Sequence, residues 1–134
     1  MKPPAVRKVV ETGVYVDDLD AARDFYTRVL GLEFHSGEPN RHVFLKAGKS
    51  MLLLFRAATT LQEKRLPAHG ATGVQHFAFE IEASDYDSWK RKLSDEGVSI
   101  EKEVDWGRAR SFYFRDPSNN VVELMTKGNW PVDD

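Results

Sequence analysis

Cysteine is absent from the 134 residues. Disulfides, thiolate metal sites and cysteine nucleophiles are therefore excluded, and any metal ion must be held by histidine and carboxylate side chains. Long apolar runs are also missing. No stretch approaches the roughly 20 residues of a membrane-spanning helix, and the N-terminal segment lacks the apolar core of a secretory signal. We therefore expect a cytoplasmic protein with no membrane partner.

An excess of charge of one sign is missing as well. The formal net charge is −2 at pH 7, so the chain has no basic surface that would attract nucleic acid. We expect no nucleic-acid partner.

The 134 residues suit one domain, and a chain of this length buries roughly two-thirds of its unfolded surface. A chain of this length can therefore form a core without disulfides or a structural metal ion.

The stretch from residue 111 to 126, SFYFRDPSNNVVELMT, contains the clearest local pattern. Aromatic and β-branched residues at 111–115 and 120–126 predict two strands, and the Asp-Pro-Ser-Asn run at 116–119 predicts the turn between them. The second strand carries Glu123 among apolar residues. A buried carboxylate without a partner is costly, so it normally pairs, becomes neutral or binds a metal. Glu123 is the first candidate for a functional residue.

The first half of the chain predicts a strand, a helix and three further strands. Residues 9–16 alternate in the manner of a strand. Asp18 can cap a helix whose apolar residues recur at helical spacing, and Gly31 can end that helix. Three strand-forming runs follow at residues 32–35, 41–47 and 51–55, separated by turn-forming residues at 36–40 and 48–50.

The second half repeats this order. The stretch 56–73 has no clear period, and we interpret it as a linker. Residues 74–81 alternate as a strand. Ser84 with Asp87 resembles the capping box of a helix that Gly97 ends. A strand over residues 98–104 and the hairpin at 111–126 complete the repeat, so each half reads βαβββ.

This internal repeat predicts the fold class and brings four residues into equivalent positions. Aligning the halves places Glu11 over His76 and Leu53 over Glu123, and three of these four are metal-ligand types. We predict an α+β fold in which two βαβββ modules, in a pseudo-twofold arrangement, form a curved mixed sheet around a central cavity. The single domain spans residues 1–134, with module one at about 9–55, the linker at 56–73 and module two at about 74–126.

Four segments carry a resemblance to a known family. They are Tyr15-Val-Asp-Asp-Leu-Asp, Leu30-Gly-Leu-Glu-Phe, Gly73-Val-Gln-His-Phe-Ala-Phe and Tyr113-Phe-Arg-Asp-Pro-Ser-Asn-Asn-Val-Val-Glu-Leu. With them the chain resembles the vicinal oxygen chelate superfamily, which contains glyoxalase I, bleomycin-resistance proteins, fosfomycin-resistance transferases and extradiol dioxygenases. The resemblance covers roughly residues 9–126.

The resemblance implies a divalent metal ion. In the family, the first and last strands of each module supply the ligands, which by position implies Glu11, His76 and Glu123. One histidine and two carboxylates suit Zn, Ni, Mn, Fe or Co without selecting among them. Leu53 occupies the position at which glyoxalase I has a fourth polar ligand, so glyoxalase I chemistry is disfavoured. The resemblance also implies a homodimer.

Further candidates lie on the strands and in the linker. His42 can face the cavity as a proton carrier, although a lone histidine is more often an ordinary strand residue. His69 lies in a loop that can cover the cavity mouth. Residues that pack in the core can also form an apolar wall for a ligand, and this substrate-binding set comprises Tyr15, Phe44, Leu53, Phe55 and Tyr113.

Two functions follow from these residues. The first is a metal-dependent lyase, isomerase or dioxygenase whose small-molecule substrate chelates the metal through adjacent oxygens, with Glu123, His42 or His69 moving a proton. The second is a metal-free protein of the bleomycin-resistance type that sequesters a hydrophobic or aromatic compound. An inactive scaffold is a third reading. The ligand set Glu11, His76 and Glu123 distinguishes the first from the second.

Overall fold

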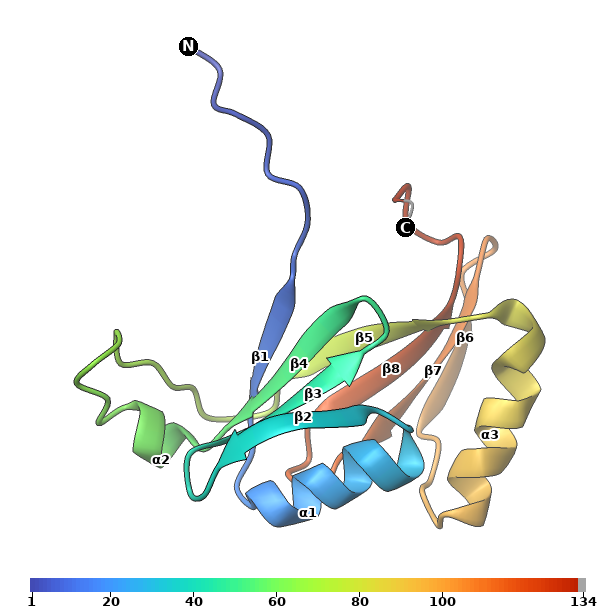
Figure 1. Ribbon diagram of the computed structural model, residues 1–134. Helices are drawn as coiled ribbons and strands as arrows, with labels where there is room; N and C mark the ends of the chain where they lie inside the picture. Colours follow the sequence, from blue (N-terminus) through green and yellow to red (C-terminus); the bar gives the residue numbers. More distant parts are fainter. Residues whose placement is uncertain (133–134) are drawn as a thin grey trace. The chain divides into compact units, whose positions relative to one another are not determined.

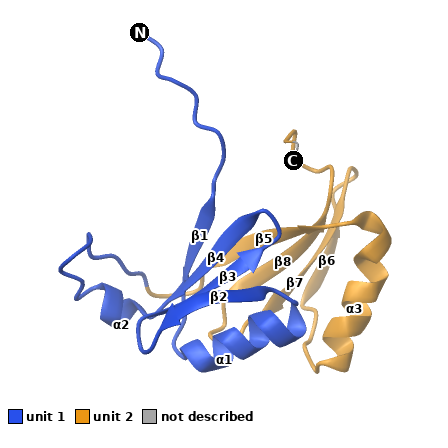
Figure 2. Ribbon diagram, in the orientation of Figure 1, with its two compact units in different colours: residues 1–71 blue, residues 72–134 orange. Residues whose placement is uncertain are grey.

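The computed structural model describes residues 1–132 of the chain in two compact units. Unit 1 comprises residues 1–71 and unit 2 begins at residue 72 (Figure 2). Each unit holds one four-stranded sheet with helices beside it (Figure 1). The predicted α+β class with two similar modules is therefore confirmed. None of the helices in the described part of the chain is long and apolar enough to cross a membrane.

Unit 1 contains seven elements. They are β1 (Glu11–Tyr15), α1 (Leu19–Asp24), the π-helical turn η1 (Phe25–Val29), β2 (Glu33–Glu38), β3 (His42–Ala47), β4 (Ser50–Phe55) and α2 (Ala57–Thr60). The strand order is β1-β4-β3-β2. β1 and β4 run parallel, whereas β3 is antiparallel to both of its neighbours. Asp18 accepts a hydrogen bond from the backbone N–H of Ala21 and so caps α1, as the sequence predicts.

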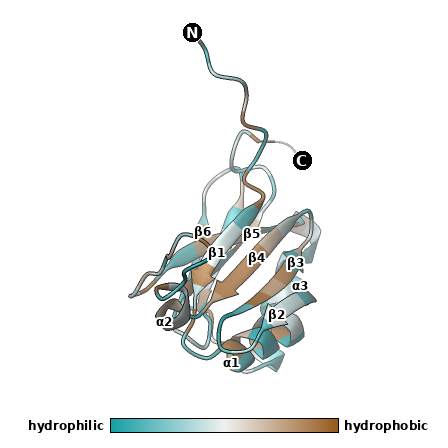
Figure 3. Ribbon diagram, turned by 60° about the vertical axis from the view of Figure 1, so that its left-hand side comes forward, coloured by the Kyte–Doolittle hydropathy of each residue, from teal (hydrophilic) through white to brown (hydrophobic). Residues whose placement is uncertain are grey.

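The two faces of the unit 1 sheet differ in composition. Because side chains alternate along a strand, Leu45, Leu52 and Leu54 share one face, and all three are buried. Helix α1 packs on that face through contacts with β3 and β4. The hydrophobic colouring of β3 and β4 is visible in Figure 3. The opposite face carries most of the residues proposed for function in this unit.

Unit 2 contains six elements. They are β5 (His76–Ile81), the 3-10 turn η2 (Ala83–Asp85), α3 (Tyr86–Asp95), β6 (Lys102–Asp105), β7 (Arg110–Arg115) and β8 (Val121–Thr126). The strand order β5-β8-β7-β6 matches that of unit 1. Tyr86 of α3 packs edge-on against Phe112, with 5.3 Å between the ring centroids. Helix α3 therefore covers the face of Phe112 and Leu124, and Tyr113 and Glu123 lie on the opposite face.

Several predicted boundaries are wrong. The strand predicted to end at His35 continues to Glu38, because a shift of register after Phe34 keeps it paired with β3. The turn is then confined to residues 39–41, where Asn40 adopts a φ of 65°. The predicted linker contains the short helix α2.

Two further corrections concern α3. The helix begins through the 3-10 turn, and neither Ser84 nor Asp85 makes a side-chain capping bond. The strand predicted over 98–104 is reduced to Lys102–Asp105. The preceding residues end the helix instead: Gly97 has a φ of 73°, and the N–H of Val98 donates to the carbonyl of Leu93 at 2.8 Å.

The turn between β7 and β8 is held by one buried carboxylate. Asp116 accepts hydrogen bonds from the backbone N–H groups of Ser118 and Asn120, both at 2.9 Å, and from the Asn120 side chain at 3.1 Å. Asn120 is itself buried, and its Oδ1 accepts from the backbone N–H of Gln75 at 3.1 Å. Asn119 adopts the left-handed conformation that the sequence predicts, with a φ of 67°.

We predict that Asp116→Ala lowers the free energy of unfolding by about 2 kcal/mol, because two backbone donors lose their acceptor. Asn119→Gly is the matched control in the same turn, and we expect it to be neutral within roughly 0.5 kcal/mol because glycine accepts positive φ without strain. Urea unfolding followed by circular dichroism measures both. An unchanged midpoint for Asp116→Ala would contradict this account of the turn.

Candidate metal and substrate site

Glu123 lies in the middle of β8 with its side chain only 5% exposed. Its Oε1 is 3.3 Å from Nε2 of His76 on the neighbouring strand. Its Oε2 is buried and has no hydrogen-bond partner within residues 1–132. A buried carboxylate oxygen without a donor is rare because desolvating the charge is costly. The arrangement therefore favours a cation at Oε2.

The His76 ring turns its Nε2 atom toward Glu123. Its Nδ1 is 3.2 Å from the carbonyl oxygen of Val121. A carbonyl can only accept, so Nδ1 carries the hydrogen, and in the neutral ring Nε2 offers its lone pair toward Glu123. Two lone pairs at 3.3 Å repel unless a proton or a metal ion lies between them. Histidine ligands commonly donate their second N–H to a carbonyl in this way. His76 and Glu123 thus fit a divalent metal.

Tyr113 faces Glu123 across the pair of strands β7 and β8. Its ring centroid is 5.9 Å from that of His76. Burial and the Glu123 carboxylate raise the pKa of Tyr113 above its usual value. The hydroxyl therefore keeps its proton at neutral pH and can donate a hydrogen bond beside the carboxylate.

Glu11, the third predicted ligand, is the first residue of β1 in unit 1. Its side chain is exposed and shares a sheet face with Tyr15. Over the residues that the structure describes, neither unit by itself gathers three histidine or acidic side chains in a metal-binding group. The role of Glu11 therefore stays a prediction.

Unit 1 brings together five of the predicted residues in what we call the aromatic cluster: Tyr15, His42, Phe44, Phe55 and His69. His42 stacks on Phe44 at 4.0 Å between centroids, and Phe44 meets Phe55 edge-on at 5.7 Å. His69 lies 4.8 Å from Phe55, and its Nδ1 is 2.5 Å from the Tyr15 hydroxyl. Strand register explains most of the cluster, because Phe55 is opposite both Tyr15 and His42.

Leu53 lies within this face. It is opposite Gly13 on one neighbouring strand and Phe44 on the other, and it is buried. An aliphatic side chain cannot bind a metal ion, so Leu53 contributes apolar packing beside the aromatic cluster.

An ion pair that the sequence did not predict supports the cluster. Arg41 Nε is 3.4 Å from Glu63 Oε2, and both side chains are nearly buried, at 11% and 13% exposure. Arg41 Nη1 is 2.6 Å from Nδ1 of His42. Glu63 lies in the stretch 56–73 without a clear period, where no sequence pattern indicates a partner for Arg41.

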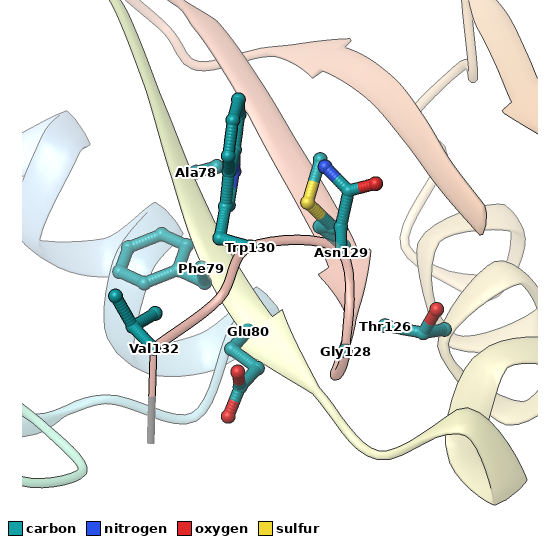
Figure 4. Close-up of a pocket in the computed structure, with 9 residues that line it drawn as sticks. Ala78, Phe79, Glu80, Thr126, Gly128, Asn129, Trp130 and Val132 are labelled. Carbon is teal, nitrogen blue, oxygen red and sulfur yellow. The ribbon is translucent and has the colours of Figure 1, made fainter. Parts of the chain in front are cut away.

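A pocket of about 220 Å³ lies in unit 2 (Figure 4). It is lined by Ala78, Phe79, Glu80, Met125, Thr126, Gly128, Asn129, Trp130 and Val132. Ala78 is opposite Glu123 in the sheet, and Met125 follows Glu123 on the same face. The pocket is therefore adjacent to the His76–Glu123 pair. The sequence did not predict it, because residues 127–132 carry no strand or helix pattern.

The comparisons with known proteins identify the family. Residues 8–124 match the model of the Glyoxalase/Bleomycin resistance protein/Dioxygenase superfamily. The chain belongs to this superfamily, which confirms the predicted resemblance.

Individual relatives cover most of the chain. Metallothiol transferase FosB of Staphylococcus epidermidis is 31% identical over 83% of this chain and 75% of its own length. Glutathione transferase FosA of Serratia marcescens is 27% identical over 81% of this chain and 73% of its own. The crystal structure of lactoylglutathione lyase from Agrobacterium tumefaciens is 37% identical, with a TM-score of 0.89, over 98% of this chain and 100% of that one.

We predict that Mn²⁺ or Zn²⁺ raises the melting temperature of the wild-type protein by several degrees, because an ion bound only to the folded state stabilises it. Glu123→Gln should abolish this increase. The metal-free variant should melt at or above the wild-type temperature, because a buried charge has been removed. His35→Gln, an exposed histidine, is the control. A metal response that survives in Glu123→Gln would exclude Glu123 as a ligand.

Proposed function

We propose that this protein is a divalent-metal-dependent enzyme acting on a small molecule that offers two adjacent oxygens. The observation that carries the proposal is the buried, unpartnered Oε2 of Glu123 beside Nε2 of His76. His76 and Glu123 would hold the metal, and Glu11 is the proposed third ligand. The relatives named above are enzymes, which supports an enzyme here.

The bound metal would supply Lewis acidity to the chelating oxygens. The other roles fall to residues of this chain. The Tyr113 hydroxyl, kept protonated beside Glu123, would donate to a substrate oxygen. Glu123 is the proposed proton acceptor, because a carboxylate with one unpartnered oxygen can bind metal and proton in turn. The pocket beside Met125 and Trp130 would receive the part of the substrate remote from the reaction.

The reaction class is proposed as lyase, isomerase or transfer to a thiol. All three relatives carry a thiol or a glutathione compound in their names. The chain has no cysteine, so any thiol must come from a substrate. Leu53 argues against a glyoxalase I mechanism that needs a fourth polar ligand. Glutathione and other small thiols are therefore the first co-substrates to screen.

A second candidate is a metal-free protein that sequesters an aromatic compound at the aromatic cluster of unit 1.

 The observation that favours it is the composition of that cluster, in which Tyr15, Phe44 and Phe55 bring three aromatic rings together and no carboxylate is present. Such a protein would bind its ligand equally well with and without metal. Elemental analysis of protein purified without chelator distinguishes the two candidates.

We predict that the purified protein contains about one divalent ion per chain. His76→Ala should lower both the metal content and the metal-dependent turnover by roughly 100-fold or more. Glu11→Gln should lower both as well. Glu33→Gln, which changes an exposed carboxylate in the same unit, is the matched control and should leave both unchanged. Full metal content in His76→Ala would overturn the proposed function.

A further inference from the structure

Arg41 is held in a fixed position immediately before β3. Its side chain is 11% exposed, and Nε of the guanidinium lies 3.4 Å from a carboxylate oxygen of Glu63 and 3.7 Å from one of Glu38. The backbone of Arg41 is also fixed, because its N–H donates to Glu38 and its carbonyl accepts from Arg56. A nearly buried guanidinium with two carboxylate partners has little freedom to turn away from its neighbours.

The direction of the hydrogen bond between Arg41 and His42 follows from chemistry. Nη1 of Arg41 lies 2.6 Å from Nδ1 of His42. A guanidinium has only donors and does not lose its proton in proteins, so Nδ1 must accept. The ring hydrogen of neutral His42 is therefore on Nε2. Protonating Nδ1 would break this bond and place a second positive charge beside Arg41.

The Nε2–H group of His42 is available to a ligand. Within residues 1–132, no hydrogen bond is made by this nitrogen, and it is not among the buried polar atoms without a partner. The ring lies flat on Phe44, with 14° between the planes, and edge-on to Phe55 at 6.3 Å. Turning the ring over would remove Nδ1 from Arg41. The N–H donor is thus fixed at the edge of the stacked His42 and Phe44 rings.

We propose that Arg41 is a positioning residue that fixes His42 as the neutral Nε2–H tautomer, and that this N–H donates to an oxygen of a planar, conjugated carboxylate or carbonyl compound that lies at the edge of the stacked His42 and Phe44 rings. The inference rests on the proposed function only for the reaction that the ligand undergoes. It changes the role of His42 from the predicted proton carrier to a hydrogen-bond donor that contacts substrate.

The charged groups around His42 agree with this assignment. Burial and then Arg41 lower the pKa of His42, and Glu38 opposes them. Glu63 lies behind Arg41, Lys46 follows on the same face of β3, and His69 lies across Phe55. Because the folded pKa lies below the unfolded value of about 6.5, this group contributes stability above that pH and loses it as the pH falls through the folded pKa.

We predict that ¹⁵N NMR of histidine-labelled, metal-free protein at pH 7 places the His42 hydrogen on Nε2, with a titration midpoint below 6.5. Arg41→Met should raise this midpoint, because Glu38 and Glu63 remain, and should allow both tautomers. Arg41→Lys should restore the low midpoint in part, since an ammonium can also donate to Nδ1. Arg56→Met removes a neighbouring guanidinium that bonds Thr59 instead, and should change neither. A wild-type ring protonated on Nδ1 would overturn the positioning role.

The ligand is tested with benzoate, a planar aromatic carboxylate. We expect benzoate to shift the Nε2–H resonance of the wild-type protein, and we expect His42→Phe to weaken binding about tenfold because it keeps the stacking and removes the donor. His42→Gln keeps a donor near the Nε2 position and should restore part of the affinity. Failure of benzoate to bind at tens of millimolar, or equal binding by His42→Phe, would overturn the ligand assignment.

These results are independent of the metal. Arg41→Met and His42→Phe should keep the metal content of the wild type, because neither residue is a proposed ligand. His76→Ala should keep the His42 tautomer. A loss of metal binding in His76→Ala together with an unchanged His42 spectrum would therefore support both proposals separately, and a failure of either one can be recognised without the other.

Discussion

The carboxylate of Glu123 is the constraint on which the rest of unit 2 depends. β8 lies between β5 and β7, so a side chain at its centre is surrounded by sheet on both sides and has little access to water. Leaving one oxygen of a buried carboxylate without a donor costs free energy that folding alone does not recover. Nε2 of the neighbouring His76, whose ring is held by the contact of Nδ1 with the Val121 carbonyl, lies 3.3 Å from the other oxygen of Glu123. The simplest way to satisfy both groups is one shared cation.

The two units have the same strand order but different chemistry on the corresponding faces. Where β8 carries Glu123, β4 carries Leu53, and where β5 begins with His76, β1 begins with Glu11. Unit 2 thus contains the polar pair, while unit 1 contains the aromatic cluster with the Arg41–His42 hydrogen bond. The two halves therefore keep one strand order while the side chains on their corresponding faces differ.

The strands and the hairpin could be predicted from sequence because they depend on local rules. Alternation defines the strand faces, and the Asp116 turn needs only four consecutive residues. The aromatic residues of the cluster could be predicted for the same reason, since period-2 alternation together with the internal repeat assigns Tyr15, Phe44 and Phe55 to one face.

The remaining features depend on contacts between segments without a pattern. Glu63 reaches Arg41 from a loop 22 residues away, and nothing in the intervening sequence indicates that pairing. The hydrogen bond from Arg41 that fixes His42 depends on rotamers, which a sequence pattern does not specify. The pocket depends on the path of residues 128–132. The late start of β6 could not be predicted for a similar reason. Val98, which suits a strand, instead closes the end of α3 through its hydrogen bond to Leu93.

The side chain of Asn120 links the β7–β8 turn to the start of β5, where the proposed metal ligand His76 lies. It bonds Asp116 within the turn and also accepts from the backbone of Gln75, the residue immediately before His76. The bond from the Val121 N–H to the Gln75 carbonyl fixes the same point from the other side. The tight turn between the two central strands thereby fixes the backbone from which the His76 ring projects, so a change in the geometry of this turn would move the His76 ring relative to Glu123.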